Sequence, residues 1–189
     1  IRNQFSTFVS VAIQEASVTY SGYLFEGNYF SNATINATTS SNYQNFLFQN
    51  NYFYANPCCI GANVNGFFNS VNVLFNHNLW FGPSSGSLDC FGGTCRFLTI
   101  TNNIFVRRDA ANQNSFSTFN NNITFNAVNN TPWASNSNVD AGGNVSNQSP
   151  LMVDQTAVNA GTDNPLNNFT IAAGPANNRE NPGPIAGAG

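Results

Sequence analysis

The densest group of charged side chains in the sequence is Arg107-Arg108-Asp109, which directly follows an apolar stretch ending at Val106. A positioned basic side chain beside a carboxylate can transfer a proton to or from a reacting group, so these residues are the first catalytic candidates. The alternative is a solvated loop cluster with local ion pairing. The sequence favours that alternative, because there is no Lys and no second cluster to support catalysis.

The remaining acids and the single histidine supply no second catalytic set. Paired carboxylates for glycoside hydrolysis must face each other across a groove, but the eight acidic residues fall at different positions of the repeat described below. His77 has no Ser or Cys partner and is interpreted as a polar substitute for asparagine. We therefore expect a non-catalytic protein without metal or cofactor. A lyase or glycoside hydrolase acting on acidic polysaccharide remains the alternative.

The four cysteines do not form the two CxxC pairs of a zinc site. Cys90 and Cys95 are close enough in sequence to clip one loop, and Cys58 or Cys59 is placed to reach a neighbouring turn of the chain. Four cysteines allow three disulfide connectivities, and buried thiols are a further interpretation. Disulfides would indicate an extracytoplasmic setting.

Charged residues make up only 7% of the 189 residues, and the formal net charge is −3. This balance argues against a nucleic-acid partner, which needs clustered cations. The sequence contains no apolar run long enough to insert into a membrane. Because the chain begins inside a repeat, we expect it to be part of a longer protein.

A short motif recurs along the chain, in which an asparagine is followed two residues later by an aromatic residue. The spacings between these asparagines are 25, 23, 27, 25 and 19 residues, and the last copy is shifted by one residue at its aromatic position. Periods of this size are typical of solenoids. The asparagines are Asn3, Asn28, Asn51, Asn78, Asn103 and Asn122.

Upstream of each asparagine, apolar and polar residues alternate, which predicts a short strand ending at a bend. Short strands are unstable alone, so we expect the copies to stack in parallel, with Phe25, Phe48 and Phe75 in one internal column. The asparagines would form a hydrogen-bonded ladder at the bend, where asparagine tolerates a left-handed backbone. The predicted fold is an all-β parallel β-helix of about six to eight coils.

The motifs Asn50-Asn51-Tyr52-Phe53 and Asn102-Asn103-Ile104-Phe105 resemble those of right-handed parallel β-helix proteins of the pectin-lyase-like superfamily, especially repeat-containing secreted and surface proteins. Such proteins end in Ser-Pro-Ala-x-Asp-Ala-Gly and Asp-Ile-Gly-Ala segments. Residues 174–178 and 183–188 look like variants of that cap, although Asn177 and Pro184 replace its acidic residues. The resemblance implies one domain over 1–189, with regular coils over 1–125 and irregular coils and a cap over 126–189.

The residue after each asparagine offers a candidate binding surface. If the following aromatic side chain points inward, alternation directs Tyr29 and Tyr52 outward, where they would stack on sugar rings. The alternative is that the bend breaks the alternation and both are core residues. We expect a secreted or cell-surface adhesin, stalk or carbohydrate-contacting scaffold, with glycans or other surface proteins as partners.

Overall fold

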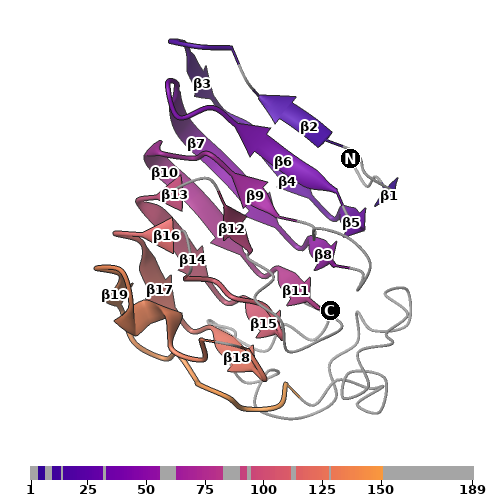
Figure 1. Ribbon diagram of the computed structural model, residues 1–189, viewed down its shortest axis with the longest axis vertical. Coiled ribbons are helices and arrows are strands. Elements are labelled where there is room, and N and C mark those ends of the chain that lie inside the picture. The colour runs from indigo at the N-terminus through magenta and orange to yellow at the C-terminus, as the bar shows by residue number, and fades with distance from the viewer. Residues whose placement is uncertain are drawn as a thin grey trace.

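A computed structural model describes residues 4–6, 10–13, 15–31, 33–55, 63–82, 90–92, 95–111, 114–127 and 129–150. These residues form a parallel β-solenoid of about five turns, which confirms the predicted all-β fold. Figure 1 shows the strands of each sheet stacked one above another in chain order. The right-handed winding and the total of six to eight coils remain predictions, and the expected cap at 174–188 lies outside the described residues.

Three parallel sheets make up the walls of the solenoid. Sheet A contains β1 (Gln4–Ser6), β5 (Tyr29–Ser31), β8 (Tyr52–Tyr54), β11 (Leu79–Phe81), β15 (Ile104–Val106) and β18 (Ile123–Phe125). Sheet B contains β2 (Ser10–Ile13), β6 (Thr34–Ala37), β9 (Val64–Asn65) and β12 (Phe91–Gly92).

Sheet C forms the longest wall. It contains β3 (Thr19–Ser21), β4 (Leu24–Glu26), β7 (Asn42–Gln49), β10 (Asn69–Asn76), β14 (Leu98–Thr101), β17 (Thr118–Asn120) and β19 (Val139–Asp140). A two-stranded sheet of β13 (Cys95–Arg96) and β16 (Asn114–Ser115) precedes β14 and β17 along the chain. The described part also has one 3₁₀ turn, η1 (Pro132–Ala134), and no helix long and apolar enough to cross a membrane.

The register of sheet C confirms the predicted internal column. Phe25 lies opposite Phe48, and Phe48 lies opposite Phe75. The rings of Phe48 and Phe75 stack with their centroids 4.3 Å apart and are fully buried. A second column from sheet A fills the other side of the bore, where Phe53 stacks on Trp80 at 3.9 Å. The regular spacing of aromatic residues in the sequence therefore brings their rings together in one packed core.

The predicted asparagine ladder is present, and its geometry is the same at each step. Asn78 illustrates it: its side-chain carbonyl accepts the backbone N–H of Asn51 at 3.0 Å and the side-chain amide of Asn51 at 3.0 Å. The amide of Asn78 in turn donates to Asn103 at 3.0 Å and to the backbone carbonyl of Phe48 at 2.9 Å. The ladder residues with this bonding are Asn28, Asn51, Asn78, Asn103, Asn122 and, beyond the predicted set, Asn144.

The left-handed backbone conformation occurs one residue earlier than predicted. The ladder asparagines themselves have no positive φ; the residue before each of them does. We call these residues the corner column: Gly27, Asn50, His77, Asn102, Asn121 and Gly143. The reason is that a ladder side chain must point inward to reach its neighbours, so the reversal of direction falls on the preceding residue.

The coil that contains Asn122 departs from the sequence prediction in one respect. Asn122 stays in the ladder, and Ile123, Thr124 and Phe125 lie opposite Ile104, Phe105 and Val106. The inward place of the aromatic residue is thus taken by the buried Thr124, whose hydroxyl donates to the Asn130 carbonyl at 2.7 Å. The copy therefore carries a substitution rather than a shift. Asn3 lies outside the described residues.

Candidate functional site

The structure does not present Arg107-Arg108-Asp109 as a solvated cluster. Arg108 is fully buried and Asp109 nearly so, while Arg107 is half-buried. The Asp109 carboxylate accepts the backbone N–H of Ala111 at 2.8 Å, and its main-chain carbonyl accepts the N–H of Cys90 at 2.8 Å. The predicted exposure is therefore wrong for Arg108 and Asp109. Because Arg108 has no exposed surface and Asp109 very little, we assign both a structural role.

Tyr29 and Tyr52 point out of the bore, as alternation predicts, but they are not an open strip. Tyr52 is fully buried and Tyr29 is half-buried, with their rings stacked at 5.6 Å. They belong to a second hydrophobic cluster, separate from the core, whose buried members are Tyr52, Leu79, Phe81 and Val106. Tyr52 in this position offers no face to a sugar ring.

His77 occupies the corner column between Asn50 and Asn102, with φ of 55°. Its Nε2 atom is buried without a hydrogen-bond partner, and burial lowers the pKa of the imidazole below its usual value. This placement supports the interpretation of His77 as a substitute for asparagine, because both residue types tolerate a left-handed backbone better than most.

Cys90 and Cys95 are both buried thiols rather than the two ends of a disulfide clip. Burial raises the pKa of the Cys95 thiol to about 12, and its sulfur lies 3.3 Å from the Gly92 carbonyl oxygen. Such a thiol is unreactive, because the nucleophilic species is the thiolate. Cys58 and Cys59 lie outside the described residues, and the described part contains no group of three or more His, Cys, Asp or Glu placed to hold a metal.

A second column of left-handed residues crosses the outer side of sheet C. We call it the kink column: Gly22, Asn45, Asn72, Phe97 and Phe116, each six residues before a ladder asparagine. Strand pairing places Asn72 beside Asn45, because their neighbours Val71 and Gln44, and Val73 and Phe46, are register partners. The column therefore continues from coil to coil, as the ladder does.

Phe97 and Phe116 are unusual members of this column. Their φ values are 57° and 54°, and they are the two large apolar residues with positive φ in the described part of the chain. A bulky side chain in this conformation is a steric outlier. Both rings are also exposed, by 53% and 48%, and they stack on each other with centroids 5.8 Å apart. We call this pair the Phe97–Phe116 platform.

The platform has a cationic neighbour. The guanidinium carbon of Arg96 lies 4.2 Å from the centroid of the Phe68 ring and 5.8 Å from that of Phe116. Stacking of this kind orients arginine through its attraction to the ring face. Arg96 thus lies between the Phe116 ring of the platform and the ring of Phe68, the residue before β10.

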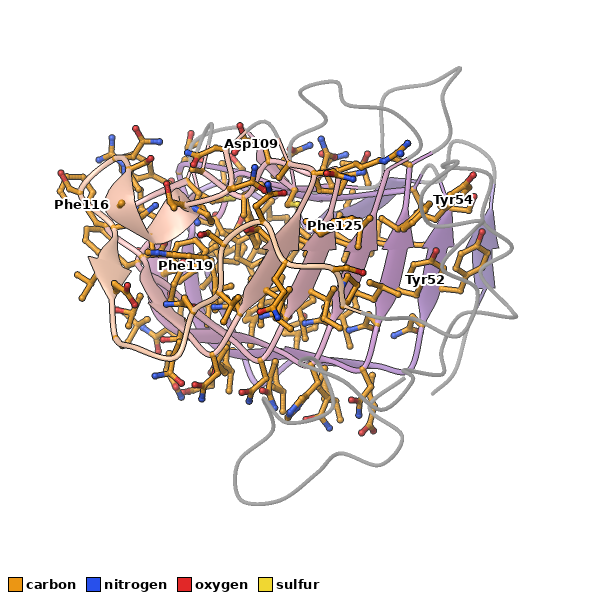
Figure 2. The ribbon with its side chains drawn as sticks, turned by 90° about the horizontal axis from the view of Figure 1, so that it is seen from below. Tyr52, Tyr54, Asp109, Phe116, Phe119 and Phe125 are labelled. Atoms are coloured by element: carbon orange, nitrogen blue, oxygen red, sulfur yellow. The ribbon has the colours of Figure 1, made fainter. Side chains whose placement is uncertain are left out.

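An open depression continues from the platform across sheet C. Its volume is about 470 Å³, and its lining comes from β7, β10 and Phe97. The lining carries amides and a hydroxyl but no charged group: Asn42, Gln44, Asn69, Ser70, Val71 and Phe97. Phe97 belongs to both features, so the platform and the depression form one continuous surface. Figure 2 shows Phe116 at the opposite side of the molecule from Tyr52 and Tyr54.

The sequence contained a signal for this surface. Three of the five residues six positions before a ladder asparagine are Gly or Asn, which is typical of a left-handed turn. Phe97 and Phe116 interrupt that pattern with residues unsuited to the conformation. The alternation of apolar and polar residues upstream of each asparagine does not by itself indicate a turn at this position.

Comparison with known proteins adds no identification. No protein-family model matches the chain, and neither a curated protein nor a solved structure matches it significantly. The parallel β-solenoid is therefore established by the structure alone, and function must be argued from the surface.

Proposed function

We propose that this chain is a non-catalytic, carbohydrate-contacting module of a secreted or cell-surface protein, and that the Phe97–Phe116 platform makes the contact. One observation carries the proposal: two exposed phenylalanines occupy backbone positions where Gly and Asn stand in neighbouring coils. They add nothing to the core and impose conformational strain. Strain kept without a packing benefit points to a function.

Carbohydrate is the class of ligand that fits this chemistry best. A sugar ring has a face of C–H groups that packs on an aromatic ring, and hydroxyls that bond to amides. The platform supplies the rings, and the depression beside it supplies Asn42, Gln44 and Asn69. Pairing apolar faces with a few polar groups is typical of ligand sites.

The solenoid suits the role of a stalk that carries this surface. Its ladder and stacked rings hold each coil to the next, so the spacing of surface residues is fixed along the axis. The low charge of the chain is compatible with a neutral partner and gives no basis for binding polyanions by charge alone. A surface location remains part of the proposal, and labelling of intact cells with an antibody against the chain tests it.

The test is a screen of immobilised polysaccharides with the purified chain and two variants. We expect the chain to bind at least one polysaccharide and the variant Phe97→Asn/Phe116→Asn to lose that binding. Leu24→Asn serves as the matched control, because Leu24 is an exposed apolar residue in another coil of sheet C. Equal binding by both variants, or no binding by the parent chain, overturns the proposal. Release of sugar products during the screen would overturn its non-catalytic part.

A further inference from the structure

We propose that the ligand of this surface is an unbranched, uncharged glycan lying along the solenoid axis, with successive sugar units on successive coils. The inference rests on the proposed function and adds the ligand's chemical class, direction and length. It follows from three features of the surface: the spacing of the rings, the continuity of the depression, and the distribution of charge.

The spacing of the rings indicates the direction in which the glycan lies. Phe97 and Phe116 are neighbours in the kink column, so the line joining their rings crosses from one coil to the next. Their centroid separation of 5.8 Å is close to the strand spacing of about 4.8 Å. Sugar units in an extended glycan recur over a comparable distance. A glycan along the axis would therefore place one sugar ring on each phenylalanine, whereas a glycan along the strands would meet only one.

The extent of the depression indicates the length of the glycan that the surface can hold. It begins at Phe97 and extends past Val71 and Asn69 of β10 to Gln44 and Asn42 of β7, which belong to the two preceding coils. The side-chain amides of Gln44 and Asn69 make no hydrogen bond to any described residue, so both remain available to a ligand. Together the platform and the depression span four coils, which corresponds to about four sugar units by the spacing above.

The distribution of charge indicates the chemical class of the glycan. No charged residue lines the depression. Of the acids on this wall, the Glu26 carboxylate accepts the Gln49 amide at 2.6 Å, and the Asp140 carboxylate accepts the Asn144 amide at 2.6 Å. Neither of these acids lines the depression. Arg96 is held on the Phe68 ring. Amides that both donate and accept are suited to hydroxyls rather than to ionised groups.

The experiment measures affinity against glycan length. Linear β-1,4-linked glucose and xylose oligomers, from dimer to hexamer, are titrated calorimetrically into the chain, together with uronate oligomers of the same lengths. We expect affinity for a neutral series to rise about tenfold or more from dimer to tetramer and then to level off. Gln44→Ala/Asn69→Ala should remove that gain, because these amides line the part of the surface that the third and fourth sugar units would reach. Circular dichroism confirms that each variant is folded.

Each alternative result has a separate meaning. Affinity that does not depend on length, or a length gain that survives Gln44→Ala/Asn69→Ala, overturns the axial arrangement while leaving the proposed function intact. Tighter binding of uronate oligomers that is abolished by Arg96→Gln overturns the uncharged class and makes Arg96 the determinant of specificity. Failure of all polysaccharides in the screen and of all oligomers overturns the proposed function itself.

Discussion

The corner column and the kink column solve the same backbone problem with different residues. Each coil turns through a positive φ at both places, so both columns favour residues that tolerate a left-handed conformation. At the corner, every described position is Gly, Asn or His, and the ladder asparagine that follows is buried in every case except Asn144, which is half-buried. At the kink, three positions are Gly or Asn, and two are exposed phenylalanines.

The difference separates residues kept for the fold from residues kept for another purpose. A left-handed conformation costs an ordinary residue roughly 1–2 kcal/mol. At the corner, Gly, Asn and His lower the cost of the left-handed conformation, and the ladder asparagine that follows each of them forms hydrogen bonds between coils. At the kink, Phe97 and Phe116 incur the cost, and only their contacts with each other and with Arg96 partly offset it. The kink column is therefore where substitution should change binding more than stability.

The largest contrast is expected between two phenylalanines of the same wall. Phe75→Ala should lower the free energy of unfolding by about 3–5 kcal/mol, because it leaves a cavity beside the stacked Phe48 ring. Phe97→Ala should lower it by less than about 1 kcal/mol, since its ring is half exposed. Denaturant unfolding followed by circular dichroism measures both. Similar losses at the two positions would mean that the platform belongs to the core.

A smaller contrast is expected between two asparagines. Asn78→Ala removes four ladder hydrogen bonds and leaves the buried backbone N–H of Asn51 without its side-chain acceptor, so we expect a loss of about 2–4 kcal/mol. Asn72→Gly keeps the left-handed backbone and removes only an exposed bond to Asn45, so its effect should stay within about 0.5 kcal/mol. The same unfolding assay applies. A mild Asn78→Ala phenotype would show that the ladder is dispensable.

These contrasts also show how much could be predicted from the sequence. The ladder and the Phe25–Phe48–Phe75 column were predictable, because parallel stacking converts a sequence period directly into register. The burial of Tyr52 was not, because alternation gives the direction of a side chain and not what lies against it. The burial of Arg108 was missed for a related reason: charge alone indicates exposure only on average.

The platform was missed because its backbone requirement is not visible in the residues that form it. Gly22, Asn45 and Asn72 indicate a turn, whereas phenylalanine does not. The backbone φ values of the structure show that Phe97 and Phe116 share the left-handed conformation of this column. Residues that depart from the local rule of a repeat are thus the ones that a repeat alignment discards, and here they carry the functional proposal.

A still smaller effect, of opposite sign, is expected at the platform. Phe116→Asn should raise the free energy of unfolding by up to about 1 kcal/mol, because asparagine tolerates the left-handed backbone that Phe116 adopts. The same substitution should weaken glycan binding. Thermal unfolding and titration calorimetry on one preparation test the two effects together. A variant that is less stable than the parent would show that the ring stack contributes more than the strain costs.

The smallest expected effect concerns the pH dependence of the corner column. Burial lowers the pKa of His77 in the folded state, so the fold favours the neutral imidazole. As pH falls through the unfolded value of about 6.5, the unfolded chain takes up a proton that the folded chain resists, and stability decreases until the lower folded pKa is passed. His77→Asn, which restores the residue found at Asn50 and Asn102, should remove this decrease. Unfolding free energies of both chains at about pH 8 and about pH 5 isolate the contribution of His77. If parent and variant lose equal stability on acidification, the carboxylates account for the pH dependence and His77 is solvated.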